Sequence, residues 1–257
     1  MTRRALVAVA VVLVSCSAMA ASGHLEGYLP AAAHAPGGHG SYWTTDVWVY
    51  QQGATRVHLW FNPEGEDGTA VDSVVLPLSA PATRFEDVVR TVFGRSDGVG
   101  SIHYLADGPV EVESRTWTAA PGGGSFGQTI AGIPITAASF AGSSQAGALR
   151  MVVDQSPSFR SNLGLVNVTP ETVTASVELF TAEGQAAPGG SAFTVDLPPF
   201  AMEQVNDLLS RLDPGTRAGL IVRVSVASDA GAVLAYLSTV DNTTNDPSYQ
   251  EAFRFGS

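Results

Sequence analysis

A single serine lies in the spacing of a hydrolase nucleophile. Residues Gly123–Gly127 fit the G-x-S-x-G pattern around Ser125, which in hydrolases forms the turn between a strand and a helix. Here the surrounding segment is rich in glycine, and the last histidine of the chain, His103, precedes the serine. Hydrolases with this turn place their histidine after the serine, although other folds use other triad orders. The pattern does not predict a serine hydrolase, and we expect no enzyme active site.

Two loops carry side chains that bind metals. His34 and His39 flank a Pro-Gly-Gly turn, but no carboxylate is spaced to complete a tetrahedral zinc set with them. An acidic loop near the C-terminus could hold calcium through oxygen ligands, although the EF-hand spacing is missing and the same residue types also build turns. We assign no metal and no cofactor, and keep this loop as an alternative. Its calcium candidates are Asp241, Asn242, Asn245 and Asp246.

Aromatic side chains are the best candidates for contact with a ligand. The four tryptophans all lie in the first half of the chain. A flat apolar ring matches the C–H face of a sugar, so tryptophans on a sheet face could bind a glycan, while burial in a core is the commoner fate of such residues. A carbohydrate platform stays open as an alternative. Its candidates are Trp43, Trp48, Trp60 and Trp117.

The composition removes several classes of function. All thirteen basic residues are arginines, which excludes lysine Schiff-base chemistry and phosphate loops of the G-K-[ST] kind. The net charge of −11 argues against binding of nucleic acid through its phosphates. Charged residues make up only 14% of the chain, so few charges oppose contact between surfaces. Self-association therefore stays open.

The first twenty residues predict an export signal. Arg3 and Arg4 precede the unbroken apolar run Ala5–Val14. This run is too short to cross about 30 Å of hydrocarbon and has the length and flanks of a signal-peptide core. We therefore expect an extracytoplasmic protein, secreted, periplasmic or lipid-anchored, with no transmembrane helix in its mature part.

The site of cleavage has two alternatives. Residues 18–20 form an A-x-A site that would make Ala21 the mature N-terminus. Residues 13–16 resemble a bacterial lipobox, in which Cys16 would carry a lipid anchor. Cys16 is the only cysteine, so a chain cut at Ala21 has no disulfide and no cysteine nucleophile.

The chain repeats itself at an offset of about 120 residues, as a duplicated domain would. The matches keep the same order in both copies, and their offset drifts slowly, as expected when only loops change length. This predicts a signal peptide at 1–20, one repeat at 22–125, a Gly/Ala/Ser-rich linker at 126–144 and a second repeat at 145–257. The matching segments are Thr45–Tyr50 with Ser161–Val166, His58–Gly65 with Val177–Gly184, Leu76–Pro77 with Leu197–Pro198, Phe85–Val89 with Val205–Leu209, and Asp107–Thr116 with Asp229–Thr239.

Short β-branched runs with alternating polarity and turns between them predict antiparallel strands. Apolar residues at three- and four-residue steps add one short helix per repeat, near 85–93 and 201–212. The predicted fold is all-β, with two tandem antiparallel β-sandwich domains of similar topology. Asp87 and Asp207 take matching places in these helices, and we expect both carboxylates to accept hydrogen bonds from loop N–H groups.

Two segments carry a resemblance to a known family. Glu26–Pro30, followed by a strand and an N-P or A-E-G turn, resembles the opening of the sensory rhodopsin transducer family, and Leu163–Asn167 is similar to its next strand. The resemblance implies a small β-sandwich that acts by binding a partner. More broadly, the chain resembles exported bacterial tandem β-sandwich proteins of unknown function.

These observations favour a non-catalytic, exported cell-envelope or secreted protein that binds an unknown protein or glycan partner. The alternatives are a structural surface subunit that self-associates through sheet edges and a carbohydrate-binding module. The residues do not identify the ligand.

Overall fold

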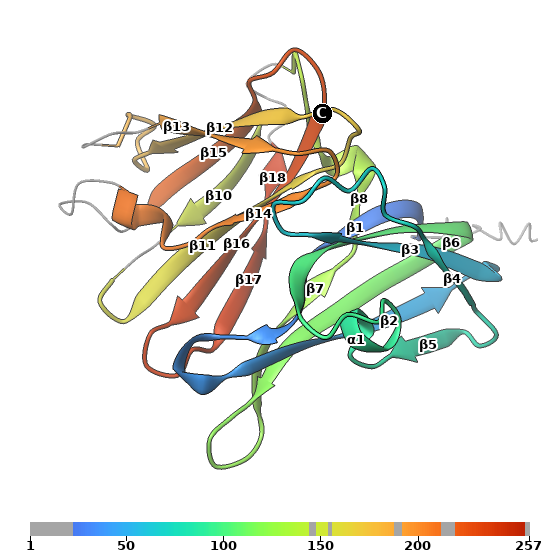
Figure 1. Ribbon diagram of the computed structural model, residues 1–257. Coiled ribbons are helices and arrows are strands. Elements are labelled where there is room, and N and C mark those ends of the chain that lie inside the picture. Colours follow the sequence, from blue (N-terminus) through green and yellow to red (C-terminus); the bar gives the residue numbers. More distant parts are fainter. Residues whose placement is uncertain (1–22, 144–147, 154–155, 188–191, 212–218, 255–257) are drawn as a thin grey trace, which may run out of the picture.

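The computed structural model describes residues 23–143, 148–153, 156–187, 192–211 and 219–254 (Figure 1). Strands dominate these ranges and the helices are short, which confirms the predicted all-β class. No helix in these ranges has both the length and the apolar character needed to cross a membrane. The predicted export signal and Cys16 lie outside the described residues.

The N-terminal half forms two strand groups that share the long strand β6. The first part of β6 pairs with β1 and β3, giving the order β4-β3-β6-β1, and its second part pairs with β2 and β7, giving β5-β2-β6-β7. The elements are β1 (His24–Pro36), η1 (Gly38–Gly40), β2 (Tyr42–Gln51), β3 (Arg56–Pro63), β4 (Val74–Pro77), β5 (Ala82–Phe85), α1 (Val88–Thr91), β6 (Gly98–Ala119), β7 (Ser125–Ala131), β8 (Ile133–Pro134), η2 (Ile135–Ala137) and β9 (Ser139–Phe140).

The C-terminal half repeats this pairing order with separate strands. One sheet has the order β13-β12-β15-β10-β18 and the other β14-β11-β16-β17. Where β6 runs on without a break in the first half, the second half has β15 and β16 with a turn between them. The elements are β10 (Leu149–Val153), β11 (Phe159–Asn167), β12 (Val173–Phe180), β13 (Ala192–Leu197), β14 (Met202–Val205), η4 (Leu208–Arg211), β15 (Leu220–Val226), β16 (Ala232–Asp241), β17 (Pro247–Glu251) and β18 (Phe253–Arg254).

Each half has an apolar core, and a third cluster joins the halves. The two cores take their side chains from both strand groups of their half, as expected for a sandwich-like packing of two sheets. Burial of apolar surface is the main force that holds such layers together. The third cluster buries apolar side chains of both halves against each other. That cluster consists of Tyr28, Ile133, Ala138, Val166, Val168, Met202, Ala232 and Leu234.

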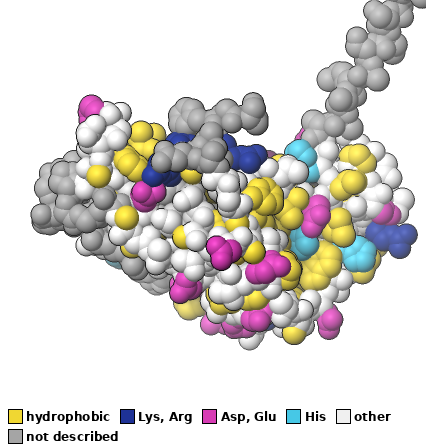
Figure 2. Space-filling model, turned by 90° about the horizontal axis from the view of Figure 1, so that it is seen from above, with side chains coloured by type: hydrophobic (Ala, Val, Ile, Leu, Met, Phe, Trp, Pro, Cys, Tyr) yellow, Lys and Arg dark blue, Asp and Glu magenta, His cyan; other side chains and the backbone are white. Residues whose placement is uncertain are grey.

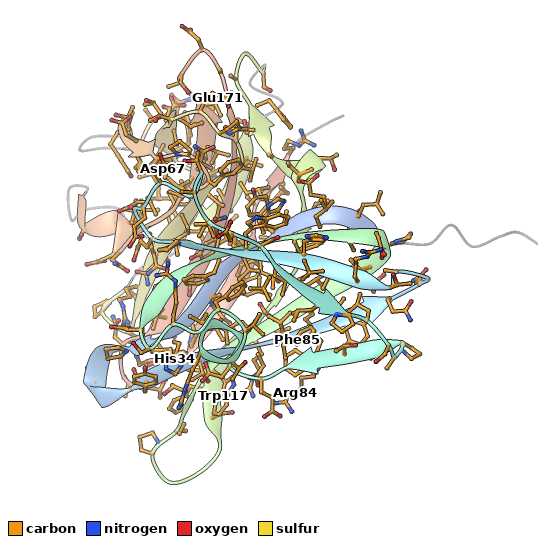
Figure 3. All side chains as sticks on the ribbon, turned by 45° about the vertical axis from the view of Figure 1, so that its right-hand side comes forward. His34, Asp67, Arg84, Phe85, Trp117 and Glu171 are labelled. Atoms are coloured by element: carbon orange, nitrogen blue, oxygen red, sulfur yellow. The ribbon has the colours of Figure 1, made fainter. Side chains whose placement is uncertain are left out.

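Backbone hydrogen bonds add to the contact between the halves. The loop after β3 reaches over the C-terminal half, where Asp67 marks it in Figure 3. The N–H of Gly68 donates to the carbonyl of Pro199 at 2.8 Å, and that of Gly65 donates to the carbonyl of Met202 at 2.9 Å. The two halves therefore meet through both an apolar cluster and directed bonds.

Over its described part, 126–143, the segment predicted as a linker forms strands joined by short turns. It provides most of β7, which pairs along β6, together with β8 and β9. Its small residues fit close packing, because a side chain on Gly127 would meet the Thr116 carbonyl and the Trp117 side chain. A segment whose composition is typical of a loop therefore forms an edge strand, β7.

The predicted helices are shorter than expected. Helix α1 covers only Val88–Thr91, and η4 is a 3-10 turn at Leu208–Arg211. The expectation of a helix from residue 201 is wrong, because Met202–Val205 is strand β14, paired with β11. Its apolar side chains point to different surroundings: Val205 packs in the C-terminal core and Met202 in the cluster between the halves.

Candidate functional site

Strand β11 presents polar side chains to the N-terminal half. Leu163 packs in the C-terminal core, so the alternation of a strand places Arg160 and Asn162 on the opposite face. Strand β16 pairs with β11 and follows the same rule, since Ser238 stands opposite Asn162 and Tyr236 is two residues away. In Figure 1 the blue strand β1 passes beside this sheet.

A glycine makes room for the tyrosine on this face. Gly164 stands opposite Tyr236, and a Cβ at Gly164 would overlap the tyrosine ring. The Tyr236 hydroxyl donates to Oε1 of Gln204 at 3.3 Å. Burial, followed by the charge of Glu64, raises the pKa of Tyr236 far above its usual range, so the hydroxyl keeps its proton.

A cavity of about 380 Å³ lies between this sheet face and the N-terminal half. Strand β1 and the turn after it supply one wall through small residues between Ala31 and Gly38, and Trp43 adds an aromatic side. The sheet supplies amides and hydroxyls, which already form part of a network: the Ser238 hydroxyl donates to Gln128 Oε1 at 3.0 Å. Besides Gln128, the residues of the cavity lining that carry side-chain amides are Asn162, Gln204, Asn206 and Asn245.

Arg160 is the single charged side chain among the residues that line the cavity. Its Nη1 donates to Oδ1 of Asn242 at 2.8 Å and its Nη2 to Oδ1 of Asn245 at 2.7 Å. Within the described ranges no carboxylate forms an ion pair with it. The guanidinium is therefore fixed by the neutral amides of two asparagines.

The candidate calcium loop uses its oxygen atoms for other contacts. Besides the two amides that hold Arg160, Asp241 Oδ1 accepts the backbone N–H groups of Thr243 and Thr244 at 2.7 and 3.0 Å. These bonds lower the pKa of Asp241. Asp246 Oδ1 accepts the N–H of Gly127 from the N-terminal half at 3.0 Å. The loop thus orients Arg160 and joins the two halves.

The repeat conserves one hydrogen bond to the short helix of each half. Asp46 Oδ1 accepts the backbone N–H of Asp87 at 2.8 Å, and Asn162 Oδ1 accepts that of Asp207 at 2.9 Å. Both helix-starting aspartates have positive φ, 46° and 48°. At both positions the backbone N–H of the aspartate is bound. The Asp87 carboxylate contacts His34 Nδ1 at 2.8 Å and makes no capping bond to its own helix, which differs from the loop N–H groups expected for it.

The rest of the Asp46 carboxylate is also occupied. Its Oδ2 accepts from Nη2 of Arg84 at 2.9 Å and from the indole N–H of Trp117 at 3.2 Å. Figure 3 labels both donors, which lie near α1 together with His34. With all these donors from its own chain, Asp46 serves to orient its neighbours.

The structure does not bring the four tryptophans together. Trp48 and Trp117 share the outer face of the β5-β2-β6-β7 group, where Arg84 lies 5.2 Å from the Trp48 ring centroid. Trp43 lines the cavity. Trp60 belongs to β3 and stacks on His103 at 4.7 Å, on the N-terminal half, where Figure 2 shows histidine, apolar and acidic side chains mixed.

The remaining motifs have structural partners. Ser125 lies in β7 and its hydroxyl accepts from Nη2 of Arg115 at 2.7 Å, so it is not on a strand-to-helix turn. His34 is buried while His39 is exposed in η1. The described part of the chain has no group of three or more His, Cys, Asp or Glu side chains arranged to hold a metal ion.

Among the cavity residues, sequence reasoning singled out only Trp43 and Asn245 as candidates for ligand contact. Asn162 entered only as a position of the repeat, and Arg160, Gln128 and Gln204 were not considered. The available signal was the polar residues that alternate with leucines in β11, a pattern that usually means a face in water. In the structure the N-terminal half covers this face of β11 and β16, and the cavity lies between them.

Comparison with known proteins gives no match from which a function could be inferred, so the functional proposal depends on the residues of this chain. No protein-family model matches the chain, and no curated protein gives a significant sequence match.

Proposed function

We propose that this is a non-catalytic, exported cell-envelope or secreted binding protein, and that the cavity between its halves takes a small polar ligand. The observation that carries the proposal is the concentration of amide, hydroxyl, indole and guanidinium groups in one cavity of about 380 Å³. Small-molecule sites have this scale and a few convergent polar groups. Export is supported by Arg3, Arg4 and the apolar run Ala5–Val14.

The types of lining residue favour binding over catalysis. General acid–base chemistry needs a group that gives or takes a proton near the working pH, most often histidine or a carboxylate. No histidine, aspartate, glutamate or cysteine is among the lining residues. Amides and hydroxyls donate and accept hydrogen bonds without changing protonation state, which suits recognition.

The position between two packed halves also supports a ligand site. The apolar cluster that includes Tyr28 and Met202 holds the halves together, so the cavity walls are set before a ligand arrives. A site that is already formed avoids the ordering cost that weakens binding.

Occlusion of the cavity tests the proposal. Asn206 lines it and is exposed, so Asn206→Trp should block the cavity without disturbing a core. Thr194→Trp on the exposed side of β13 is the matched control. Saturation-transfer NMR against a panel of monosaccharides, uronic acids, amino acids and hydroxy acids should find a ligand that binds wild type and the control but not Asn206→Trp. Saturable binding that survives Asn206→Trp, or no binding from the whole panel, contradicts the proposal.

A carbohydrate platform is the second candidate, and it rests on a different surface. Trp48 and Trp117 are both half-buried on one sheet face, flanking the Asp46 and Arg84 pair. On a glycan array, the double substitution of both tryptophans by alanine should abolish any signal. Tyr50→Ala, which removes an exposed aromatic from the same strand, should leave it unchanged.

A further inference from the structure

The charge inside the cavity points to one class of ligand. Arg160 is its single charged lining residue, in a chain whose net charge is −11. Arg56 and Arg223 have carboxylate partners, Asp107 and Glu178, at 3.1 and 2.7 Å. Arg115 and Arg254 contact a hydroxyl and backbone carbonyls, as Arg160 contacts amides, but they do not line the cavity. Because the other residues that line the cavity are neutral, an anionic group of a ligand can pair with the Arg160 guanidinium there.

The guanidinium is held in one orientation. A guanidinium has five N–H donors, and each terminal nitrogen of Arg160 gives one of them to an asparagine oxygen. One of these asparagines, Asn245, is only 7% exposed and has a φ of 63°, in the turn that Asp241 fixes. The donors that remain match the planar geometry of a carboxylate, which arginine binds as a fork.

The other lining groups describe the rest of the ligand. Beyond the bonds that their oxygens already make, Gln128 and Asn162 have amide N–H donors, and the Tyr236 oxygen can still accept a hydrogen bond. These groups suit hydroxyl or amide groups of a ligand. Trp43 provides a flat apolar surface of the kind that packs on a sugar ring or a short chain. The volume lies at the small end of ligand sites.

We infer that the cavity binds a small monocarboxylate that also carries hydroxyl or amide groups, with Arg160 on the carboxylate. This rests on the proposed function and gives its site a ligand class. Because charge-assisted hydrogen bonds are worth about 1.5–3 kcal/mol, loss of Arg160 should weaken binding roughly 10- to 100-fold.

The test compares two probes of equal shape, acetate and acetamide. The ¹⁵N-labelled exported protein is titrated with each at constant ionic strength, while the Nε–H signal of Arg160 and the indole N–H signal of Trp43 are followed. Acetate should shift the Arg160 signal saturably, and acetamide should act at least about tenfold more weakly. In Arg160→Gln the Trp43 response to acetate should fall by the same factor. Arg115→Gln, on the outer sheet face, should respond as wild type does.

Equal responses to both probes, or an unchanged acetate response in Arg160→Gln, overturn the inference. Glucuronate and N-acetylglycine then separate hydroxyl-bearing from amide-bearing ligands, and each should compete with acetate if its class fits. A neutral sugar that binds and is blocked by Asn206→Trp, in a protein that ignores acetate, refutes the carboxylate assignment and leaves the binding function standing. Failure of acetate and of the whole panel refutes both.

Discussion

The substitution Gly164→Ala tests the sheet face from which the cavity is built. A methyl group on Gly164 would overlap Cδ1, Cε1 and Cζ of the Tyr236 ring. The ring is only 1% exposed and its hydroxyl contacts Gln204, so it cannot move into water. Overpacking of this kind typically costs about 1–3 kcal/mol. At roughly 2–4 °C per kcal/mol for a chain of this size, the melting temperature should fall by roughly 2–12 °C.

The assay is a thermal melt followed by circular dichroism, with Gly38→Ala as the matched control. A methyl group on Gly38 would meet only Nδ2 of Asn245, at 3.9 Å, so this variant should melt with wild type. In a Tyr236→Ala background the penalty of Gly164→Ala should vanish, because the two residues are coupled by contact. A Gly164→Ala protein as stable as wild type would refute the pairing of Gly164 with Tyr236, and with it the assignment of this face.

Three further predictions concern pH, the repeat and export. Burial lowers the pKa of His103 despite its bond to a carboxylate, so the unfolded chain binds the proton first and the free energy of unfolding falls as the pH drops below about 6.5. Between about pH 7.5 and 5.5 the melting temperature of His103→Phe should therefore fall less than that of wild type. An equal fall in both proteins would contradict this. Asn162→Leu should cost about 1–3 kcal/mol in a denaturant melt by orphaning the Asp207 N–H, whereas Asn162→Asp, the residue of the first repeat, should be mild. Intact mass spectrometry should find either lipidated Cys16 or free Ala21 at the N-terminus, and a full-length cytoplasmic chain would refute export.

The strands of the second half follow closely from the sequence. The apolar patterns at Thr172–Phe180, Ala218–Val226 and Ala232–Val240 agree with β12, β15 and β16 to within two residues at each end, because side chains there alternate between a core and another surface. Strand β1, His24–Pro36, was missed, since its alanines, glycine and prolines carry little strand preference. Tertiary pairing with β6 and β2 fixes it instead.

The candidate site could not be predicted from local patterns. It forms where the outer face of β11 and β16 meets β1, residues more than a hundred positions apart in the sequence. Local patterns singled out the loop 241–246 as a turn or an alternative calcium loop. Only the three-dimensional arrangement shows that its residues Asn242 and Asn245 hold Arg160.

The central claim is that the ligand lies between the halves, and methyl NMR of alanine-labelled protein tests it directly. Ala31, Ala33 and Ala35 line the cavity, so their methyl signals report on its contents. On saturation with a ligand found in the panel, these methyls and the Trp43 indole should shift together. Shifts confined to Trp48 and Trp117, with the three alanine methyls unchanged, would place the ligand on the outer sheet face and contradict the account.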